Sequence, residues 1–410
     1  MIINEKIKNL ASCVEKEIAP YFDTVDEIAR FNQEKVLDAF IKNRVGENCL
    51  HSSTGYGYGD VGRETLEAIF SDVFGCEDAI VRHNIVNGTH CLAISLFAVL
   101  RPGDTLLAAT GKPYDTLEEV IGICGNAGGS LKEFGVGYKQ VDLVNGAIDF
   151  DGIKNALTPD VKAVILQRSK GYDWRDTLSS EKLGEAISFI KSLSPDVCCI
   201  VDNCYGEFSQ KTEPTQHGAD MVVGSLIKNA GGGLAHTGGY IAGKKKYIEL
   251  AANRTTAPGI GKECGATIGQ NRVMYQGLFM APHTVAQAIK SAIFCGALMQ
   301  KLGYEVNPLP QKEHFDIIQA IKFGSEEKLI KFIQGIQKAS PIDSFATPLP
   351  WDMPGYQHQV IMAAGTFVSG SSIELSADAP IKEPYVGFVQ GGLTYESARL
   401  AIMHAASEII

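Results

Sequence analysis

The sequence predicts an α/β protein in which a large domain with a mostly parallel sheet precedes a smaller α+β domain. Two observations lead to this prediction. Short apolar runs alternate with helical or loop segments through the first part of the chain, a pattern typical of buried parallel strands. After about Pro282 the pattern changes to one long helix, followed by shorter helical and extended pieces. A large sheet of this kind followed by a smaller C-terminal domain is therefore expected.

The N-terminal part of the chain predicts helices. Apolar residues recur at helical spacing in Glu5–Glu17 and again in Val25–Asn43. The stretch His51–Arg63 is rich in Gly and Tyr, which excludes regular structure throughout. We expect residues 1–55 to form an N-terminal helical arm.

The large domain is predicted over residues 56–283, and the small domain over residues 284–410. A helix at Arg63–Phe74 opens the large domain, and a long helix at Thr284–Leu302 opens the small one. The apolar runs that predict the strands are Asp78–Val81, Thr105–Ala109, Ala163–Leu166, Val197–Val201, Met221–Gly224 and Gly239–Ala242.

Composition narrows the class of protein. The 410 residues carry a formal net charge of −10, which argues against nucleic acid and anionic membranes as partners. The first residues contain no apolar block of the kind found in signal peptides, and no later run is long enough to span a bilayer. The ten cysteines are scattered without a CxxC pair, which favours free thiols and a cytoplasmic location. The histidines show no metal-ligand spacing, so we expect no metal site.

Lys228 follows the apolar run Met221–Gly224 and precedes the glycines 231–233. An apolar flank lowers the pKa of a lysine toward the neutral amine that Schiff-base chemistry needs. Ser225 could donate its hydroxyl to a phosphate, and the glycines permit close approach of a planar ligand. The alternative is an ordinary solvated lysine at a strand end.

Asp202 ends the apolar run Cys198–Val201, which places its carboxylate at the C-terminal edge of a buried strand. Ligands bind at this edge in open α/β sheets. A carboxylate there could pair with the protonated ring nitrogen of a cofactor and keep that ring an electron sink. A helix N-cap or turn aspartate is the alternative. The separation from Lys228 is long enough for one crossover between neighbouring strands.

Two further features belong to the same predicted site. Asn87, Gly88 and Thr89 form a turn before an apolar helix, and a helix N-terminus after a glycine turn is a natural phosphate site. Tyr114 follows the strand Thr105–Ala109 and could stack on a ring at the same sheet edge, or simply pack against its own loop. Phosphate turn, carboxylate strand and lysine, in this order, predict pyridoxal 5'-phosphate as the cofactor.

The arrangement resembles the fold-type I pyridoxal phosphate enzymes, and among them the branch of cystathionine lyases and methionine gamma-lyase. It is most similar to a bacterial family described as cystathionine beta-lyase-like, aluminium resistance or methionine gamma-lyase proteins. The resemblance covers nearly the whole chain and implies that the large sheet is of a seven-stranded type. The phrases that carry it are Gly55–Asp60, Asn87–His90, Gln167–Tyr172, Val201–Glu207 and Gln390–Glu396.

The resemblance implies a site shared between the subunits of a homodimer or homotetramer. Tyr56 or Tyr58, with Arg63, match residues that reach the phosphate of a neighbouring subunit, although the glycine-rich loop departs from the usual spacing of that branch. It also implies Lys228 as the internal aldimine lysine, with Asp202 and Tyr114 beside it as the other catalytic residues.

Relatives bind the substrate carboxylate with an arginine from the small domain, because a planar guanidinium matches a carboxylate. Here Lys382 stands in that neighbourhood, and a lysine is not an equivalent group. Arg168 is the other predicted substrate-binding residue. Further candidates, each also explained by a surface salt bridge, are Arg254, Arg272 and Arg399.

The implied activity is a carbon–sulfur lyase acting on a sulfur-containing amino acid, by methionine gamma-lyase or cystathionine beta-lyase chemistry. The residues themselves predict only pyridoxal phosphate chemistry on an amino acid, since the same core serves many reactions. An aldolase or racemase, or a protein of this fold with a non-catalytic regulatory role, are the alternatives. No GxxxxGK[ST] or strand-linked GxGxxG supports a nucleotide-binding protein.

Overall fold

The computed structural model describes residues 2–56, 59–125, 128–353, 356 and 358–410. Its larger sheet has seven strands in the order β1-β7-β6-β5-β4-β2-β3, and β7 alone runs antiparallel to its neighbours. The mostly parallel sheet is thus confirmed. The strands are β1 (Asp78–Arg82), β2 (Thr105–Ala108), β3 (Gly137–Gln140), β4 (Val161–Gln167), β5 (Cys198–Asp202), β6 (Met221–Ser225) and β7 (Gly239–Gly243).

Helices cover both faces of the larger sheet, because its central strands are apolar on both sides. In β5, for example, Val201 belongs to one hydrophobic cluster and Ile200 to another on the opposite face. The helices of this part are α2 (Val61–Phe74), α3 (Gly88–Val99), α4 (Asp115–Ile121), α5 (Phe150–Ala156), α6 (Ser180–Leu193) and α7 (Lys245–Thr255). Short 3-10 helices lie at Glu47–Leu50, Pro214–His217, Asn229–Gly231 and Gly261–Glu263.

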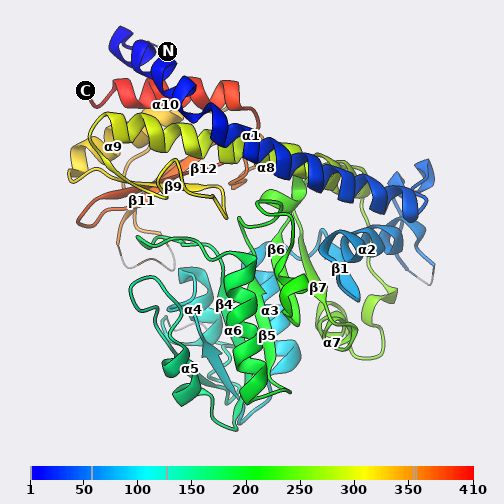
Figure 1. The fold of residues 1–410 in the computed structure, drawn as a ribbon. Coiled ribbons are helices and arrows are strands. Elements are labelled where there is room, and N and C mark those ends of the chain that lie inside the picture. The colour runs from blue at the N-terminus through cyan, green and yellow to red at the C-terminus, as the bar shows by residue number, and fades with distance from the viewer. Residues whose placement is uncertain (1, 57–58, 126–127, 354–355, 357) are drawn as a thin grey trace.

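The smaller sheet is antiparallel throughout, in the order β10-β11-β12-β9-β8. One face packs against α8 and α9, on which α10 lies in turn, and the other faces the larger part of the protein (Figure 1). The elements are α8 (Asn271–Lys301), β8 (Glu305–Asn307), β9 (Ile318–Lys322), α9 (Glu326–Lys338), β10 (Val360–Ala363), β11 (Ser376–Pro380), β12 (Val386–Gln390) and α10 (Tyr395–Ser407).

The N-terminal arm is one helix, α1 (Glu5–Lys42), so the prediction of two helices is wrong. Pro20 lies inside it, and a proline removes one helical hydrogen bond. The buried stripe of α1, which includes Ile7, Val14 and Val36, continues past this point and packs along α8 (Figure 1). Tertiary packing along the whole length therefore outweighs the lost bond.

Two other differences concern the ends of elements. The long helix α8 begins at Asn271 rather than Thr284, because Pro282 lies inside a continuous helix. The predicted boundary between residues 283 and 284 therefore falls within α8, and the division into domains stays a prediction. Strand β3 was not predicted, since Gly137–Gln140 is a half-exposed edge strand without an apolar run. None of the helices in the described part of the chain has the length and apolar character that a membrane span requires.

Candidate active site

A cavity of about 170 Å³ lies at the C-terminal edge of the larger sheet, where ligands of such sheets bind. The strands β4, β5 and β6 all end at it. Another hollow, of about 540 Å³, lies between α1 and α8 and is lined by none of the residues predicted to bind the cofactor. The lining of the smaller cavity includes Asn87, Gly88, Thr89, Tyr114, Gln167, Ser169, Asp202, Cys204, Tyr205, Ser225, Lys228 and Tyr356.

Asp202 and Lys228 come together because β5 and β6 are neighbours in the sheet, with Asp202 opposite Val223. The chain runs from the end of β6 into Lys228, whose Nζ lies 4.1 Å from the centre of the Tyr205 ring. One carboxylate oxygen of Asp202 accepts a hydrogen bond from the backbone N–H of Cys204 at 3.1 Å. The structure therefore places Asp202 at the end of β5 and Lys228 just after the end of the adjacent strand β6, at one sheet edge.

The electrostatics of this pair differ in part from expectation. Burial raises the pKa of Asp202, although the charge of Lys228 opposes the rise. Burial lowers the pKa of Lys228, as expected, but Cys204, Tyr205, Asp202 and Glu207 outweigh it, so the pKa rises overall. The expected net lowering is wrong because the acidic neighbours come from other segments of the chain. A ligand that binds to Asp202 weakens one of the charge interactions that keep Lys228 protonated.

The N-terminus of α3 forms one wall of the cavity. Asn87 caps the helix by accepting from the N–H of His90 at 2.9 Å, while the N–H groups of Gly88 and Thr89 precede the first helical bond. A Cβ on Gly88 would lie 3.1 Å from Cys204 Sγ and 3.8 Å from Ser225 Cβ. Glycine thus lets the helix end approach the strand ends closely. Two free N–H groups, the helix dipole and the Ser225 hydroxyl fit a phosphate group.

Tyr114 stands at the start of α4 and lines the same cavity. Its hydroxyl lies 3.0 Å from that of Tyr356, and its ring centre lies 6.2 Å from that of Tyr172. Burial raises the pKa of Tyr114 well above its usual value, so the phenol stays protonated. The ring could therefore stack on a planar cofactor, as expected from its place after β2.

Arg168 does not reach the cavity, contrary to the expectation that it binds substrate. Its fully buried guanidinium donates to Asn203 Oδ1 at 2.7 Å and to Gln210 Oε1 at 2.7 Å, and lies 3.6 Å from a carboxylate oxygen of Glu213. These contacts lie beneath the strand ends. The Arg168 side chain therefore stabilises the protein around the strand ends and does not bind a ligand.

The other cationic candidates lie outside the inner cavity. Lys382 lines an outer cleft of about 210 Å³ that shares Tyr114 and Tyr356 with the cavity. Arg399 is paired with Glu15 at 2.6 Å. Arg254 donates to a backbone carbonyl on the surface, and Arg272 is exposed. Within the described residues, Lys382 alone among these candidates lines a cleft connected to the site.

The loop before α2 and the first turn of that helix carry the residues predicted to reach a neighbouring subunit. Tyr56 is 92% exposed, whereas Tyr58 lies outside the described residues. Arg63 is buried and donates to the backbone oxygens of Gly55, Glu263 and Gly265. Its guanidinium therefore holds this loop to a second loop, and the predicted role across a subunit interface stays a prediction.

The structure adds residues that sequence reasoning did not assign. Cys204 and Tyr205 come two and three residues after Asp202, so the strand-end argument could have included them. Tyr172 lies in a phrase that carries the family resemblance, but no role followed from it. Tyr356 and Asp378 gave no local signal, because they reach the site only through the fold of the smaller sheet.

The fold and the site define a pyridoxal phosphate-dependent enzyme of fold type I. The pyridoxal 5'-phosphate dependent protein YhfS of Escherichia coli shares this fold at 16% identity, with a TM-score of 0.62 over 94% of this chain and 97% of its own. The family model for methionine gamma-lyase matches residues 7–410. The chain belongs to this family and is a lyase.

Relatives match over nearly the whole length. The uncharacterized protein YnbB of Bacillus subtilis is 50% identical over 408 residues, which is 99% of this chain and 97% of its own. A carbon-sulfur lyase involved in aluminium resistance from Clostridium novyi is 50% identical with a TM-score of 0.96, covering 100% of this chain and 97% of its own. A candidate cystathionine beta-lyase involved in aluminium resistance from Clostridium acetobutylicum is 49% identical with a TM-score of 0.97, covering 100% and 96%.

Proposed function

We propose that this protein is a carbon–sulfur lyase that binds pyridoxal phosphate through Lys228 and cleaves a sulfur-containing amino acid. The observation that carries the proposal is the pairing of β5 with β6, because Asp202 ends β5 and Lys228 follows the end of β6 at the ligand-binding edge. The family match and the description of the Clostridium novyi relative as a carbon-sulfur lyase favour this reaction over others on the same fold.

The residues present fit the cofactor from end to end. Gly88, Thr89 and Ser225 would hold the phosphate, and Asp202 would hold the ring nitrogen in its protonated form. Tyr114 would cover the ring. When bound, the cofactor supplies an electron sink for the negative charge that develops at the substrate α-carbon.

The chain itself contributes binding and proton transfer. The Nζ atom of Lys228, once free of the cofactor, is the base that removes the substrate α-proton. The ring of Tyr205, 4.1 Å away, limits where that amine can go. The Tyr114 hydroxyl keeps its proton and can donate a hydrogen bond at the cleft. Loss of a thiol and hydrolysis of the released enamine then give a 2-oxo acid and ammonia.

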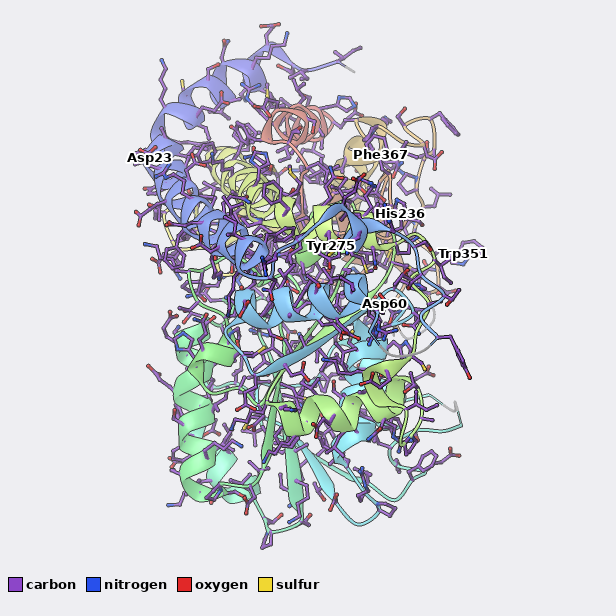
Figure 2. The ribbon with its side chains drawn as sticks, turned by 90° about the vertical axis from the view of Figure 1, so that its right-hand side faces the viewer. Asp23, Asp60, His236, Tyr275, Trp351 and Phe367 are labelled. Carbon is purple, nitrogen blue, oxygen red and sulfur yellow. The ribbon has the colours of Figure 1, made fainter. Side chains whose placement is uncertain are left out.

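We also propose that two copies of the chain share the site. Tyr56 is 92% exposed on the loop before α2, and Trp351 and Phe367 are 73% and 67% exposed. Figure 2 shows Trp351 and Phe367 toward the same side of the molecule as Asp60, which caps α2. Large apolar side chains gathered on one side favour a partner surface there. Light scattering on the purified protein tests this, and an active monomer would overturn it.

Product analysis tests the reaction. The cofactor-loaded protein is incubated with S-alkyl cysteines, S-alkyl homocysteines and methionine, and thiol and 2-oxo acid are measured in the same samples. Equal amounts of thiol and 2-oxo acid are expected from at least one series. Release of an aldehyde, or exchange of the α-proton without thiol, would instead identify an aldolase or racemase.

A further inference from the structure

A carboxylate in the smaller sheet faces the active site. In β11, Ala377 and Ala379 belong to the hydrophobic core under the helices, so Asp378 between them points to the opposite face. It lies directly across from Phe388 in β12, and such pairs share a face. The Phe388 ring packs 5.2 Å from that of Tyr172, in the larger part of the protein. Asp378 therefore looks toward the loops that carry the site.

Only one of the two carboxylate oxygens of Asp378 accepts a hydrogen bond of normal geometry. Its Oδ2 accepts from the side chain of Gln390 at 3.0 Å, but Oδ1 is buried and has no hydrogen-bond partner among the described residues. The buried hydroxyl of Tyr172 also lacks a formed hydrogen bond there. The two groups lie close enough for Tyr172 to stabilise the charge of Asp378. The Tyr172 hydroxyl can donate to Asp378 after a small shift, but neither it nor Gln390 supplies the positive charge that balances a buried carboxylate.

Aromatic side chains connect this spot to the cofactor cavity. The Tyr172 ring centre lies 6.2 Å from that of Tyr114 and 5.9 Å from that of Tyr356, and both of these tyrosines line the cavity. Lys228 is near enough for its charge to act on Asp378. A substrate held at Lys228 would therefore extend its side chain along the tyrosines toward Asp378.

The charges around this path are unbalanced. Within the described residues, no lysine or arginine lies within ion-pair distance of Asp378. In the outer cleft Lys112 pairs with Glu118 at 2.6 Å, and Lys170 donates to Asn307 Oδ1 at 2.6 Å. These two cations are already engaged by the protein, and Lys382, exposed in the same cleft, forms no ion pair with Asp378. A carboxylate without its own cation, next to the cluster of tyrosines, is suited to an incoming cation.

We propose that Asp378, with the Tyr172 hydroxyl, forms a subsite for an ammonium group on the substrate side chain, beyond the sulfur atom. The inference rests on the proposed function and narrows its substrate class to thioethers that carry a second amine. Plain alkyl thioethers leave the subsite unfilled and are the poorer substrates. Asp378 determines specificity through the leaving group and does not touch the bond that breaks.

A matched pair of substrates isolates the subsite. S-(2-aminoethyl)-cysteine and S-propyl-cysteine have the same length and differ by an ammonium in place of a methyl group, and the homocysteine analogues serve if the enzyme prefers them. The wild-type enzyme should give the higher kcat/KM with the amine. Asp378→Asn should lower kcat/KM for the amine by about 10- to 100-fold, the range of a charge-assisted hydrogen bond. The value for the propyl compound should change by less than about threefold.

Two further variants sharpen the test. Tyr172→Phe should lower the preference for the amine in the same direction but less. Glu383→Gln removes an equal charge from an exposed position near the outer cleft and should leave the preference intact.

Several outcomes would overturn the inference. A wild-type enzyme without preference for the amine does so even if Asp378→Asn fails to fold. An equal loss on both substrates would show that Asp378 supports the sheet or acts on the α-amino group common to both. If neither compound releases a thiol, the proposed function itself fails, which is a distinct result.

Discussion

The inner cavity around Lys228 and the outer cleft toward Lys382 are built in different ways. The inner cavity consists of the ends of β4, β5 and β6 and the start of α3, which one sheet places together. The outer cleft joins loops of the larger part to Pro380, which ends β11 of the smaller sheet, and to Lys382 just after it. The inner region has the groups that hold a cofactor, whereas the outer region contacts only the part of a substrate that extends out of the inner cavity.

The inner region therefore determines the reaction, and the outer region determines which substrates are preferred. Parallel strands bring Asp202 and Lys228 to one edge whatever the substrate, so the inner region can serve many reactions. The face of the smaller sheet presents Asp378 and Phe388 to whatever lies beyond the reacting carbon. Changes in the inner region should therefore affect every substrate, and changes in the outer region should affect some substrates more than others.

The largest effect is expected from Lys228→Ala. Loss of the base and of the covalent attachment should lower kcat by about 10⁴-fold, or roughly 5 kcal/mol, for all thioethers alike. Steady-state rates on both members of the substrate pair measure this. Lys154→Ala, an exposed change on α5, is the control and should leave the rates unchanged. Substantial turnover by Lys228→Ala would contradict the role of the lysine.

Arg168→Met should act on stability. Removing the guanidinium leaves Glu213 buried without its cation, which costs about 3–5 kcal/mol. Denaturant unfolding should show this loss, while KM changes little in the protein that remains folded. A raised KM at unchanged stability would instead restore Arg168 as a substrate-binding residue.

Asp202→Asn should weaken catalysis while leaving the site formed. An amide keeps the shape but cannot stabilise a protonated ring nitrogen, so kcat should fall by about 10²-fold, or about 3 kcal/mol. The visible spectrum of the bound cofactor should shift at the same time. An unchanged spectrum and rate would mean that Asp202 serves only as a turn residue.

The smallest effect is a pH dependence in the outer region. Burial raises the pKa of Asp378 to about 6, so the carboxylate loses its charge as pH falls through 6. The amine substrate should then lose its advantage by about tenfold per pH unit, while the propyl compound does not. The groups near Asp378 are Lys228, Gln390, Tyr114, Tyr172, Tyr205 and Tyr356, and none of them changes charge near pH 6. In Asp378→Asn the ratio of kcat/KM for the amine and the propyl compound should not change with pH. A pH dependence of this ratio that remains in the variant would contradict the assignment.

The sequence could predict the inner region because its residues stand next to local signals. Asp202 and Lys228 follow apolar runs, and Gly88 precedes an apolar helix. The same local view failed where distant segments interact. It divided α1 at Pro20, because packing against α8 is not visible in a short window. It also expected a lowered pKa for Lys228, because it did not include Cys204, Tyr205 and Asp202, which together raise that pKa more than burial lowers it.

The outer region could not be predicted for the same reason. Asp378 is one acidic residue in a short strand of small residues, and alternation alone assigns it to one of two faces. Which face meets the active site depends on the pairing of β11 with β12 and on the packing of Phe388 against Tyr172. Arg168 shows the converse: it is predicted as an arginine that could bind the substrate carboxylate, but its buried side chain contacts Asn203, Gln210 and Glu213 instead.

Cofactor attachment tests the central claim most directly. The protein is loaded with pyridoxal phosphate, reduced with borohydride and digested, and the modified peptide is identified by mass spectrometry. We expect a visible absorption band that reduction removes, with the label on the peptide that contains Lys228. A label on another lysine, or a protein that gives no such band, would contradict the site and the function proposed for it.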